Sequence, residues 1–265
     1  MTPHSPDLLS TIEFVKDGWL LLRIEGHSLQ CFNPFKGKSY KYPSNVRAVR
    51  LTSLAFSTCP TFPDCLTVGI WAYNYSVHIS YHRARNHQWE YCNIECDSQT
   101  GIRFSSNSNS SPKYHDGSFY FLDTNGNLGV LKMVDEEWIW KVHKGPVLED
   151  ISLYSCQLAE LGGQLISVFI KENGIRIQVF KFDTLGNHWV AIDDLGDYML
   201  FLSPASSFSV STKDNSMRNR IYLQKRIGNE MVFYSLNDGM YHTSSSQRPS
   251  KDFYGMRSQS FCCWL

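Results

Sequence analysis

Short runs of apolar and β-branched residues, separated by turn residues, dominate the chain. The clearest pair joins Ser118–Leu122 to Asn127–Met133 through Asp123–Gly126. Asn125 and Gly126 supply residue types that accept the positive φ angles of tight hairpin turns. Two further segments follow the same pattern: Gln164–Ile170 with Ile175–Phe182 across Asn173–Gly174, and Arg220–Gln224 with Met231–Leu236 before Asp238–Gly239. The pattern predicts antiparallel hairpins.

These hairpins belong to a unit that recurs along the chain. Trp89, Trp138 and Trp189 lie 49 and 51 residues apart, each near the end of one unit. A period of this length is typical of a propeller or another repeat array, because one unit cannot bury its own apolar face. We therefore predict an all-β fold, a β-propeller of four-stranded blades, with about five recognisable blades or six with closure. The predicted blades cover residues 18–43, 65–92, 113–142, 162–192 and 206–243.

Three segments fit the pattern less clearly. Residues 148–161 have a loose 3.6-residue apolar spacing, which suits a helix or a strand with loops. The polar stretch Ser105–Pro112 is predicted to be a mobile surface loop between blades. The tail 244–260 is similarly polar, until Phe261–Leu265 reads as the start of a strand.

Composition limits the possible environments. The 265 residues are 42% hydrophobic and 14% aromatic, and the formal net charge is zero. No global field therefore attracts nucleic acid or an anionic membrane. Apolar runs such as Trp19–Leu22 are too short to span a bilayer, and residues 1–15 show no secretory signal. We expect an intracellular protein, cytoplasmic or nuclear, with neither nucleic acid nor membrane as a partner.

The cysteines and histidines give no convincing metal site. The eight cysteines show no disulfide or zinc spacing, so we expect free thiols: Cys31, Cys59, Cys65, Cys92, Cys96, Cys156, Cys262 and Cys263. His78 and His82 are four apart, but in a strand four residues span about 13 Å, too far for one metal. Cys92 and Cys96 lack a second ligand pair. The side chains of adjacent Cys262 and Cys263 point to opposite faces of a strand.

Charged clusters give no convincing catalytic site either. Asp135–Glu137 reads as an acidic hairpin tip and Asp193–Asp194 as a turn, because carboxylates that are neighbours on a strand diverge. Basic clusters next to Tyr81 and Tyr222 resemble a nucleic-acid surface, but they do not form one stripe: His82–Arg85, Arg218–Arg220 and Lys225–Arg226. No hydrolase, P-loop or dinucleotide motif is present. We expect no catalytic, cofactor-binding or metal-binding residue, core positions for the tryptophans, and a binding face in the loops.

Several motifs together carry a family resemblance. Lys16–Leu22, Phe32–Phe35 and Tyr42–Pro43 resemble the first well-marked repeat of the plant F-box-associated β-propeller family, a kelch-repeat-like group. Lys113–Val130 is similar to its central repeat. Four later segments look like its final repeats: Leu195–Leu202, Ser207–Val210, Arg218–Tyr222 and Phe233–Leu236. The resemblance covers residues 12–265.

The resemblance implies a substrate-recognition domain. Members of that family typically carry an F-box, which docks on the Skp1-type adaptor of a cullin ubiquitin ligase, while the propeller engages the protein to be ubiquitinated. Only about a dozen residues precede Phe14, which is too few for an F-box, so direct adaptor binding is not expected. We predict a single propeller domain over residues 1–265, without an F-box or cofactor, which binds a protein and is not an enzyme. The alternatives are a truncated gene product without activity and an enzyme on a propeller scaffold.

Overall fold

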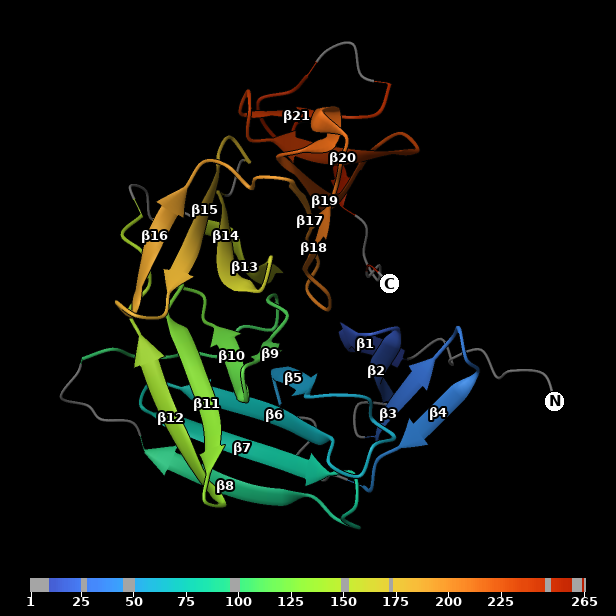
Figure 1. The fold of residues 1–265 in the computed structure, drawn as a ribbon, viewed down its shortest axis with the longest axis vertical. Helices are drawn as coiled ribbons and strands as arrows, with labels where there is room; N and C mark the ends of the chain where they lie inside the picture. The colour runs from blue at the N-terminus through green and yellow to red at the C-terminus, as the bar shows by residue number, and fades with distance from the viewer. Residues whose placement is uncertain are drawn as a thin grey trace.

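The structure, a computed structural model, describes residues 10–24, 28–44, 51–95, 101–148, 153–171, 174–245, 249–258 and 264. These residues form five β-sheets, and α-helix is absent from the described ranges. Figure 1 shows the sheets arranged around a common centre as the blades of a five-bladed propeller. The predicted fold class is confirmed, with five blades.

The first four blades are antiparallel meanders in which the first strand lies nearest the centre. Blade 1 contains β1 (Ser10–Lys16), β2 (Trp19–Ile24), β3 (Ser28–Asn33) and β4 (Lys38–Lys41). Blade 2 contains β5 (Ser53–Phe56), β6 (Leu66–Tyr73), β7 (Ser76–Arg83) and β8 (Glu90–Glu95). Blade 3 contains β9 (Lys113–His115), β10 (Ser118–Leu122), β11 (Leu128–Val134) and β12 (Glu137–His143). Blade 4 contains β13 (Leu153–Leu161), β14 (Gln164–Lys171), β15 (Ile177–Asp183) and β16 (His188–Ile192).

Blade 5 departs from the meander. Its strands are β17 (Tyr198–Phe201), β18 (Phe208–Ser211), β19 (Arg220–Ile227), β20 (Glu230–Ser235), β21 (Met240–His242) and β22 (Arg257–Ser258), with a 3₁₀ turn η3 (Asn215–Met217) before β19. β17 pairs parallel with β19, and β18 adds a further strand on the inner side. The predicted fifth blade, 206–243, therefore missed β17.

The predicted blade boundaries also missed inner strands elsewhere. β1 precedes the predicted start at residue 18, β5 precedes residue 65, and β13 precedes residue 162. Residues 153–161, where a helical spacing was one alternative, form the strand β13. β5 is short and buried on both faces, and residues 156–159 of β13 are all buried, so these two strands lack the alternation of half-buried and exposed positions seen in β8 and β12.

The segment Ser105–Pro112 was predicted to be a surface loop, and this prediction is wrong. Asn107, Ser110 and Ser111 are buried. Ser53 Oγ donates to the Asn107 carbonyl at 3.0 Å, and the Ser110 hydroxyl accepts the Leu158 N–H at 3.0 Å. The Ser110 hydroxyl thus satisfies a backbone group of the inner strand β13, while the Ser53 side chain of the inner strand β5 satisfies a backbone carbonyl of the segment.

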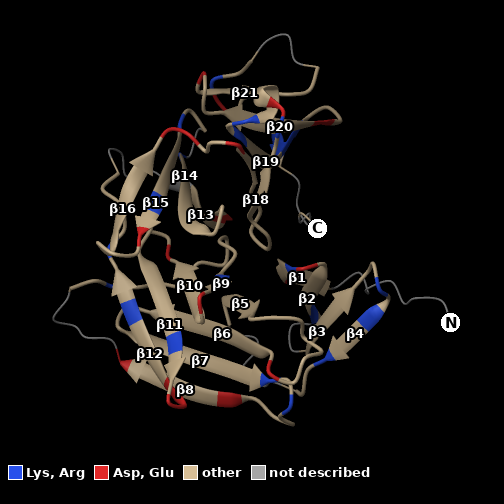
Figure 2. Cartoon of the chain, viewed as in Figure 1, with Lys and Arg blue, Asp and Glu red and all other residues tan. Residues whose placement is uncertain are grey.

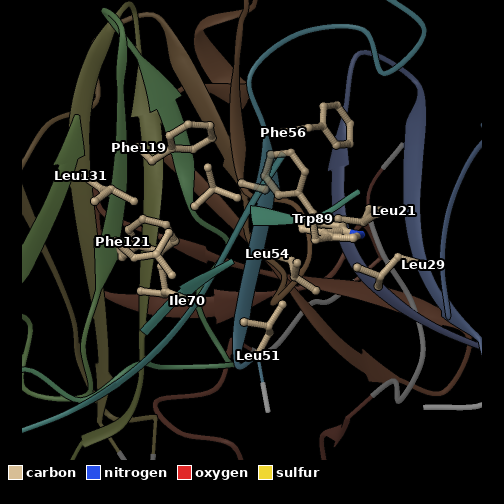
Figure 3. Close-up of a cluster of buried hydrophobic side chains, with 14 of the residues drawn as sticks. Leu21, Leu29, Leu51, Leu54, Phe56, Ile70, Trp89, Phe119, Phe121 and Leu131 are labelled. Carbon is tan, nitrogen blue, oxygen red and sulfur yellow. The ribbon is translucent and has the colours of Figure 1, made fainter. Parts of the chain in front are cut away.

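Apolar clusters hold neighbouring blades together. The largest spans blades 1 to 3, and Figure 3 shows part of it, from Leu21 and Leu29 to Phe119, Phe121 and Leu131. A second cluster joins blades 3 and 4, and a third joins blades 4 and 5. A small fourth cluster places Ala205, from the β17–β18 loop, against Val15, Leu20 and Leu22 of blade 1. Contacts between the first and last blades therefore close the ring.

The hairpin turns follow the expected chemistry only in part. Gly126 has φ of 81°, Gly174 has 73° and Gly239 has 69°, as the turn patterns predict. Asn125 is absent from the positive-φ residues, and the Asp123 carboxylate instead accepts the N–H groups of Asn125 and Asn127. Asn173 lies outside the described residues.

Candidate functional site

The three repeated tryptophans lie at similar places in their blades, at or near the start of the fourth strand. Trp89 directly precedes the fourth strand of blade 2, while Trp138 and Trp189 are each the second residue of the fourth strand in blades 3 and 4. Trp89 and Trp189 are buried. The Trp89 Nε1–H donates to the Pro43 carbonyl at 3.0 Å, and Trp138 packs edge-on against Tyr81 with ring centroids 5.3 Å apart. These side chains join blades, as the sequence predicted.

Of the candidate metal ligands, the two histidines lie on one strand, as predicted. His78 and His82 are both on β7. His78 stacks on Trp71, while His82 is buried among Tyr40, Tyr42 and Trp89. Cys96, Cys262 and Cys263 lie outside the described residues. No group of three or more His, Cys, Asp or Glu side chains suited to a metal occurs among the residues the structure describes.

The charged clusters occupy turns and strand faces. Asp135 and Glu136 form the β11–β12 turn with φ of 49° and 65°, and the Glu136 carboxylate pairs with Arg83. Asp194 accepts the Gly196 N–H in a turn. The basic residues are separated from one another: Arg85 pairs with Asp64, Arg218 with Asp197, and Lys225 lies over the Phe253 ring. Figure 2 shows Lys and Arg interspersed with Asp and Glu over the blades.

A cavity of about 410 Å³ lies at the centre of the ring, where β1, β9 and β13 approach the β17–β18 loop. We call it the central cavity. Four of the side chains that line it are aromatic: Phe14, Tyr114, Phe208 and Trp264. Its charged side chains are Lys16, Asp17, Lys113 and Glu160. The Trp264 Nε1–H donates to the Leu202 carbonyl at 3.0 Å, and its ring packs edge-on against Phe201.

Two ammonium groups lie along this cavity without a close carboxylate. Lys16 Nζ donates to the Ser57 carbonyl at 2.7 Å and lies 5.3 Å from the centre of the Tyr114 ring. Lys113 Nζ donates to the Ser207 carbonyl at 2.5 Å. The ion pairs within 4.0 Å among the described residues include neither lysine. Both cations are therefore held by single neutral carbonyl groups.

Burial disfavours the charged form of both lysines. It lowers the pKa of Lys113 to about 8, against the attraction of Glu160, and the nearby positive charge of Lys16 lowers this pKa further. Burial also lowers the pKa of Lys16, while Asp17 and Glu160 act in the opposite direction. Glu160 itself faces His115, with 3.9 Å between Oε1 and Nδ1. The central cavity thus places two partly desolvated ammonium groups near the carboxylates of Asp17 and Glu160, which form no ion pair with them within 4.0 Å.

A second candidate site is an exposed face of blade 2. Strand register places Trp71 opposite His78, and His78 opposite Asn93. The Trp71 and His78 rings are stacked at 4.7 Å, and the His78 Nδ1 lies 2.7 Å from Asn93 Oδ1. Tyr73 is 62% exposed, while Trp71 and Tyr91 are each 37% exposed. We call the exposed side chains of Trp71, Tyr73, His78 and Tyr91 the aromatic face.

The two sites lie at opposite ends of β6. Lys16 of the central cavity bonds to Ser57, and the Ser57 N–H bonds to the Leu66 carbonyl at the start of β6. Trp71 and Tyr73 are near the end of that strand. The sequence patterns predicted neither the central cavity nor the aromatic face, although His78 was considered as a metal ligand. Alternation of Trp71 and Tyr73 with buried Ala72 was the one available signal for the aromatic face, whereas the cavity depends on residues from four blades.

Comparisons with known proteins place the chain in a family. The family model described as KIB1-4 beta-propeller matches residues 5–247. A search of the curated proteins found no match. No helix among the described residues has the length and apolar character to cross a bilayer.

Solved structures with a similar course of the chain are distant. A protein of unknown function from Bacteroides thetaiotaomicron has a TM-score of 0.44 and 12% identity, over 89% of this chain and 58% of that one. A complex of S. cerevisiae Dbp5 with Nup159, Gle1, IP6 and ADP gives a TM-score of 0.36 and 11% identity, over 91% and 60%. The N-terminal domain of Nup159 gives 0.34 and 8%, over 83% and 60%. The chain spans about three fifths of the length of these chains. From the family match, which covers most of its length, this chain belongs to the KIB1-4 beta-propeller family.

Proposed function

We propose that this chain is a non-catalytic protein-binding module, and that the aromatic face of blade 2 is its main contact surface. Trp and Tyr are enriched at the energetically dominant positions of protein interfaces, because they bury large areas at low entropic cost. Trp71, Tyr73 and Tyr91 gather on one sheet face and leave a substantial part of each ring in contact with solvent. This grouping is the observation that carries the proposal.

The charge of this face indicates the chemistry of the partner. Strand register places seven half-buried or exposed side chains on the same side of β6, β7 and β8: Trp71, Tyr73, Ser76, His78, Tyr91, Asn93 and Glu95. The set contains one carboxylate, on Glu95, and neither lysine nor arginine. Aromatic ring faces attract cations. The proposed partner therefore presents a lysine or arginine among apolar side chains.

Within this function, we place the chain among the substrate-recognition propellers of F-box ubiquitin-ligase receptors in plant cells. The resemblance of Lys16–Leu22, Phe32–Phe35 and Lys113–Val130 to that family supports the assignment. In such a role the propeller holds a target protein near the ligase and contributes proximity rather than chemistry. The site of action would be the cytoplasm or nucleus.

Affinity purification tests the proposal with matched variants. The tagged chain, its W71A/Y73A double variant and an I139A/V190A control are purified from plant cells, and co-purifying proteins are quantified. Ile139 and Val190 are each 42% exposed on other blades, so the control removes exposed apolar side chains away from the aromatic face. We expect a partner that the wild-type chain and the control retain and the double variant loses. Equal recovery of every co-purifying protein by all three chains would refute the proposal that the aromatic face is the contact surface.

The same samples test the ligase role. Recovery of a Skp1-type adaptor and a cullin together with the partner would support the receptor function. A reproducible partner without these subunits would instead favour a binding module that acts outside a ligase. Binding of the purified partner to the purified chain, measured by calorimetry, separates direct from indirect contacts.

A further inference from the structure

The central cavity contains two ammonium groups that make no direct ion pair, although Asp17 and Glu160 also line it, and the proposed protein-binding function uses neither lysine. Lys16 and Lys113 belong to different blades, yet both line the same cavity. Both side chains are partly buried, and an ammonium group that loses water without gaining a direct anionic partner carries a free-energy cost. Two such groups beside one cavity favour the entry of an anion.

The donor inventory limits which anion fits. Each ammonium has three N–H donors, and each lysine donates to one carbonyl, at Ser57 or Ser207. Two donors remain on each side chain, which gives four in total. A carboxylate offers about four lone-pair sites, so one carboxylate can use them all. A phosphate group would bring further oxygens that these four donors could not satisfy.

The side chains that line the cavity indicate which kind of molecule would carry the carboxylate. Phe14, Tyr114, Phe208 and Trp264 surround the lysines with aromatic surface, and about 410 Å³ is available. The Trp264 Nε1–H is already donated to Leu202, so this ring presents only apolar surface and its π face. We propose that the central cavity binds a carboxylate carried on an aromatic body, with the carboxylate between the ammonium groups of Lys16 and Lys113.

Two kinds of ligand carry a carboxylate on an aromatic body. One is a small aromatic carboxylic acid, and the other is the C-terminal carboxylate of a protein that ends in an aromatic residue. The test therefore has two ligand series. One compares 3-phenylpropanoate with its neutral alcohol, 3-phenylpropanol. The other compares a short peptide ending in Phe with a free carboxylate and the same peptide with a C-terminal amide. Inorganic phosphate serves as the anion control.

Calorimetry with the full chain measures all five ligands. We expect one or both carboxylates to bind, and the alcohol, the amide and phosphate to bind at least tenfold more weakly. K113M and K16M should each weaken the carboxylate by at least tenfold. K132M is the matched control, because Lys132 is exposed on β11. The series that binds shows whether the ligand is a small acid or a protein C-terminus.

Proton uptake gives an independent readout. Five titratable groups surround Lys113: Lys16 and Asp17 on β1 and its turn, Tyr114 and His115 on β9, and Glu160 on β13. Because the pKa of Lys113 is about 8, part of this group is neutral at pH 8, and a bound carboxylate should draw a proton onto it. Titrations in buffers of different ionisation enthalpy should show this uptake in the wild-type chain and less of it in K113M.

Each result of these titrations either supports or overturns the carboxylate site. Equal binding of acid and alcohol, binding that K16M and K113M leave unchanged, or no binding of either carboxylate at millimolar concentration would overturn the inference. If either lysine variant fails to fold, ¹⁵N chemical shifts of the Lys Nζ groups in the wild-type chain replace it: they should move with 3-phenylpropanoate and stay fixed with 3-phenylpropanol. The aromatic face lies at the other end of β6, so failure of one site leaves the other untouched.

Discussion

The Val15 N–H donates a hydrogen bond of 2.9 Å to the carbonyl of Ala205, and this bond joins the first blade to the last. Val15 is on the inner strand of blade 1, and Ala205 lies in the β17–β18 loop of blade 5. The Ala205 methyl group is buried against Val15, Leu20 and Leu22. Ser111 Oγ also donates to this carbonyl, at 3.2 Å. Among the described residues, the five-bladed ring therefore closes through contacts made by this loop.

Enlarging the side chain at this closure should destabilise the whole ring. We expect A205L to lower the free energy of unfolding by about 1–3 kcal/mol, because added methylene groups in a packed cluster force neighbours out of position. Urea denaturation followed by tryptophan fluorescence measures the effect. L185A is the control, since Leu185 is 94% exposed, and its change should stay within about 0.5 kcal/mol. Equal effects for the two variants would show that the Ala205 contact does not stabilise the ring.

The buried segment 104–112 gives a second prediction. S110A removes the hydroxyl that accepts the Leu158 N–H and leaves that buried donor without a partner. The expected loss is about 1–3 kcal/mol of unfolding free energy. S108A, an exposed position two residues earlier, should change stability by less than about 0.5 kcal/mol. Hydrogen exchange at the Leu158 amide should also become faster in S110A. Unchanged exchange would contradict the structural role of this segment.

A third prediction concerns acid. Burial lowers the pKa of His82, and its Nδ1 has no hydrogen-bond partner among the described residues. The unfolded chain therefore binds a proton on this histidine more readily than the folded chain. The contribution of neutral His82 to the free energy of unfolding should be complete above the ordinary histidine pKa near 6.5. The free energy of unfolding should fall as pH drops below that value.

Urea midpoints between pH 5 and pH 8 measure this dependence. H82F keeps an aromatic ring among Tyr40, Tyr42 and Trp89 but cannot titrate, so it should reduce the slope. Some slope should remain, because burial and Lys141 also lower the pKa of His143. H87Q, at an exposed position on the same blade, is the control. A slope that is the same in the wild-type chain and H82F would rule out His82 as its source.

The close packing of β11 gives a fourth prediction. A Cβ atom on Gly129 would lie 2.2 Å from Trp140 Cη2 and 3.0 Å from Phe104 Cε2. G129A should therefore cost about 1–3 kcal/mol and alter the near-UV circular dichroism of Trp140. Gly37 has φ of 59° and an added Cβ would meet nothing within 4 Å, so G37N should have little effect, because Asn tolerates this conformation. If G129A is as stable as the wild-type chain, Trp140 can move without cost.

The outer parts of the blades could be predicted because their signals are local. Ser118–Leu122 and Gln164–Lys171 alternate or concentrate apolar residues beside a glycine turn, and both form strands. Trp138 and Trp189 mark equivalent fourth strands. The acidic hairpin tip at Asp135 could also be predicted from the neighbouring residues alone.

The inner strands and the central segment could not be predicted in the same way. β13 is enclosed between blades, so its apolar residues do not alternate clearly with polar ones. The serines and asparagines of residues 105–112 are typical of a surface loop. They are buried because unpaired backbone groups at the centre of the ring need polar partners.

The sequence by itself determined the repeat, the all-β class and the hairpins, because strand alternation and turn chemistry act over a few residues. Only the tertiary structure decided the number of blades, the closure at Ala205 and the pairing of β17 with β19, because these depend on contacts between residues far apart in the chain. It also brought Lys16 and Lys113 to one cavity and left Trp71 and Tyr73 on one open face. Desolvation and exposure arise from the whole assembly, so no single segment carries their signal.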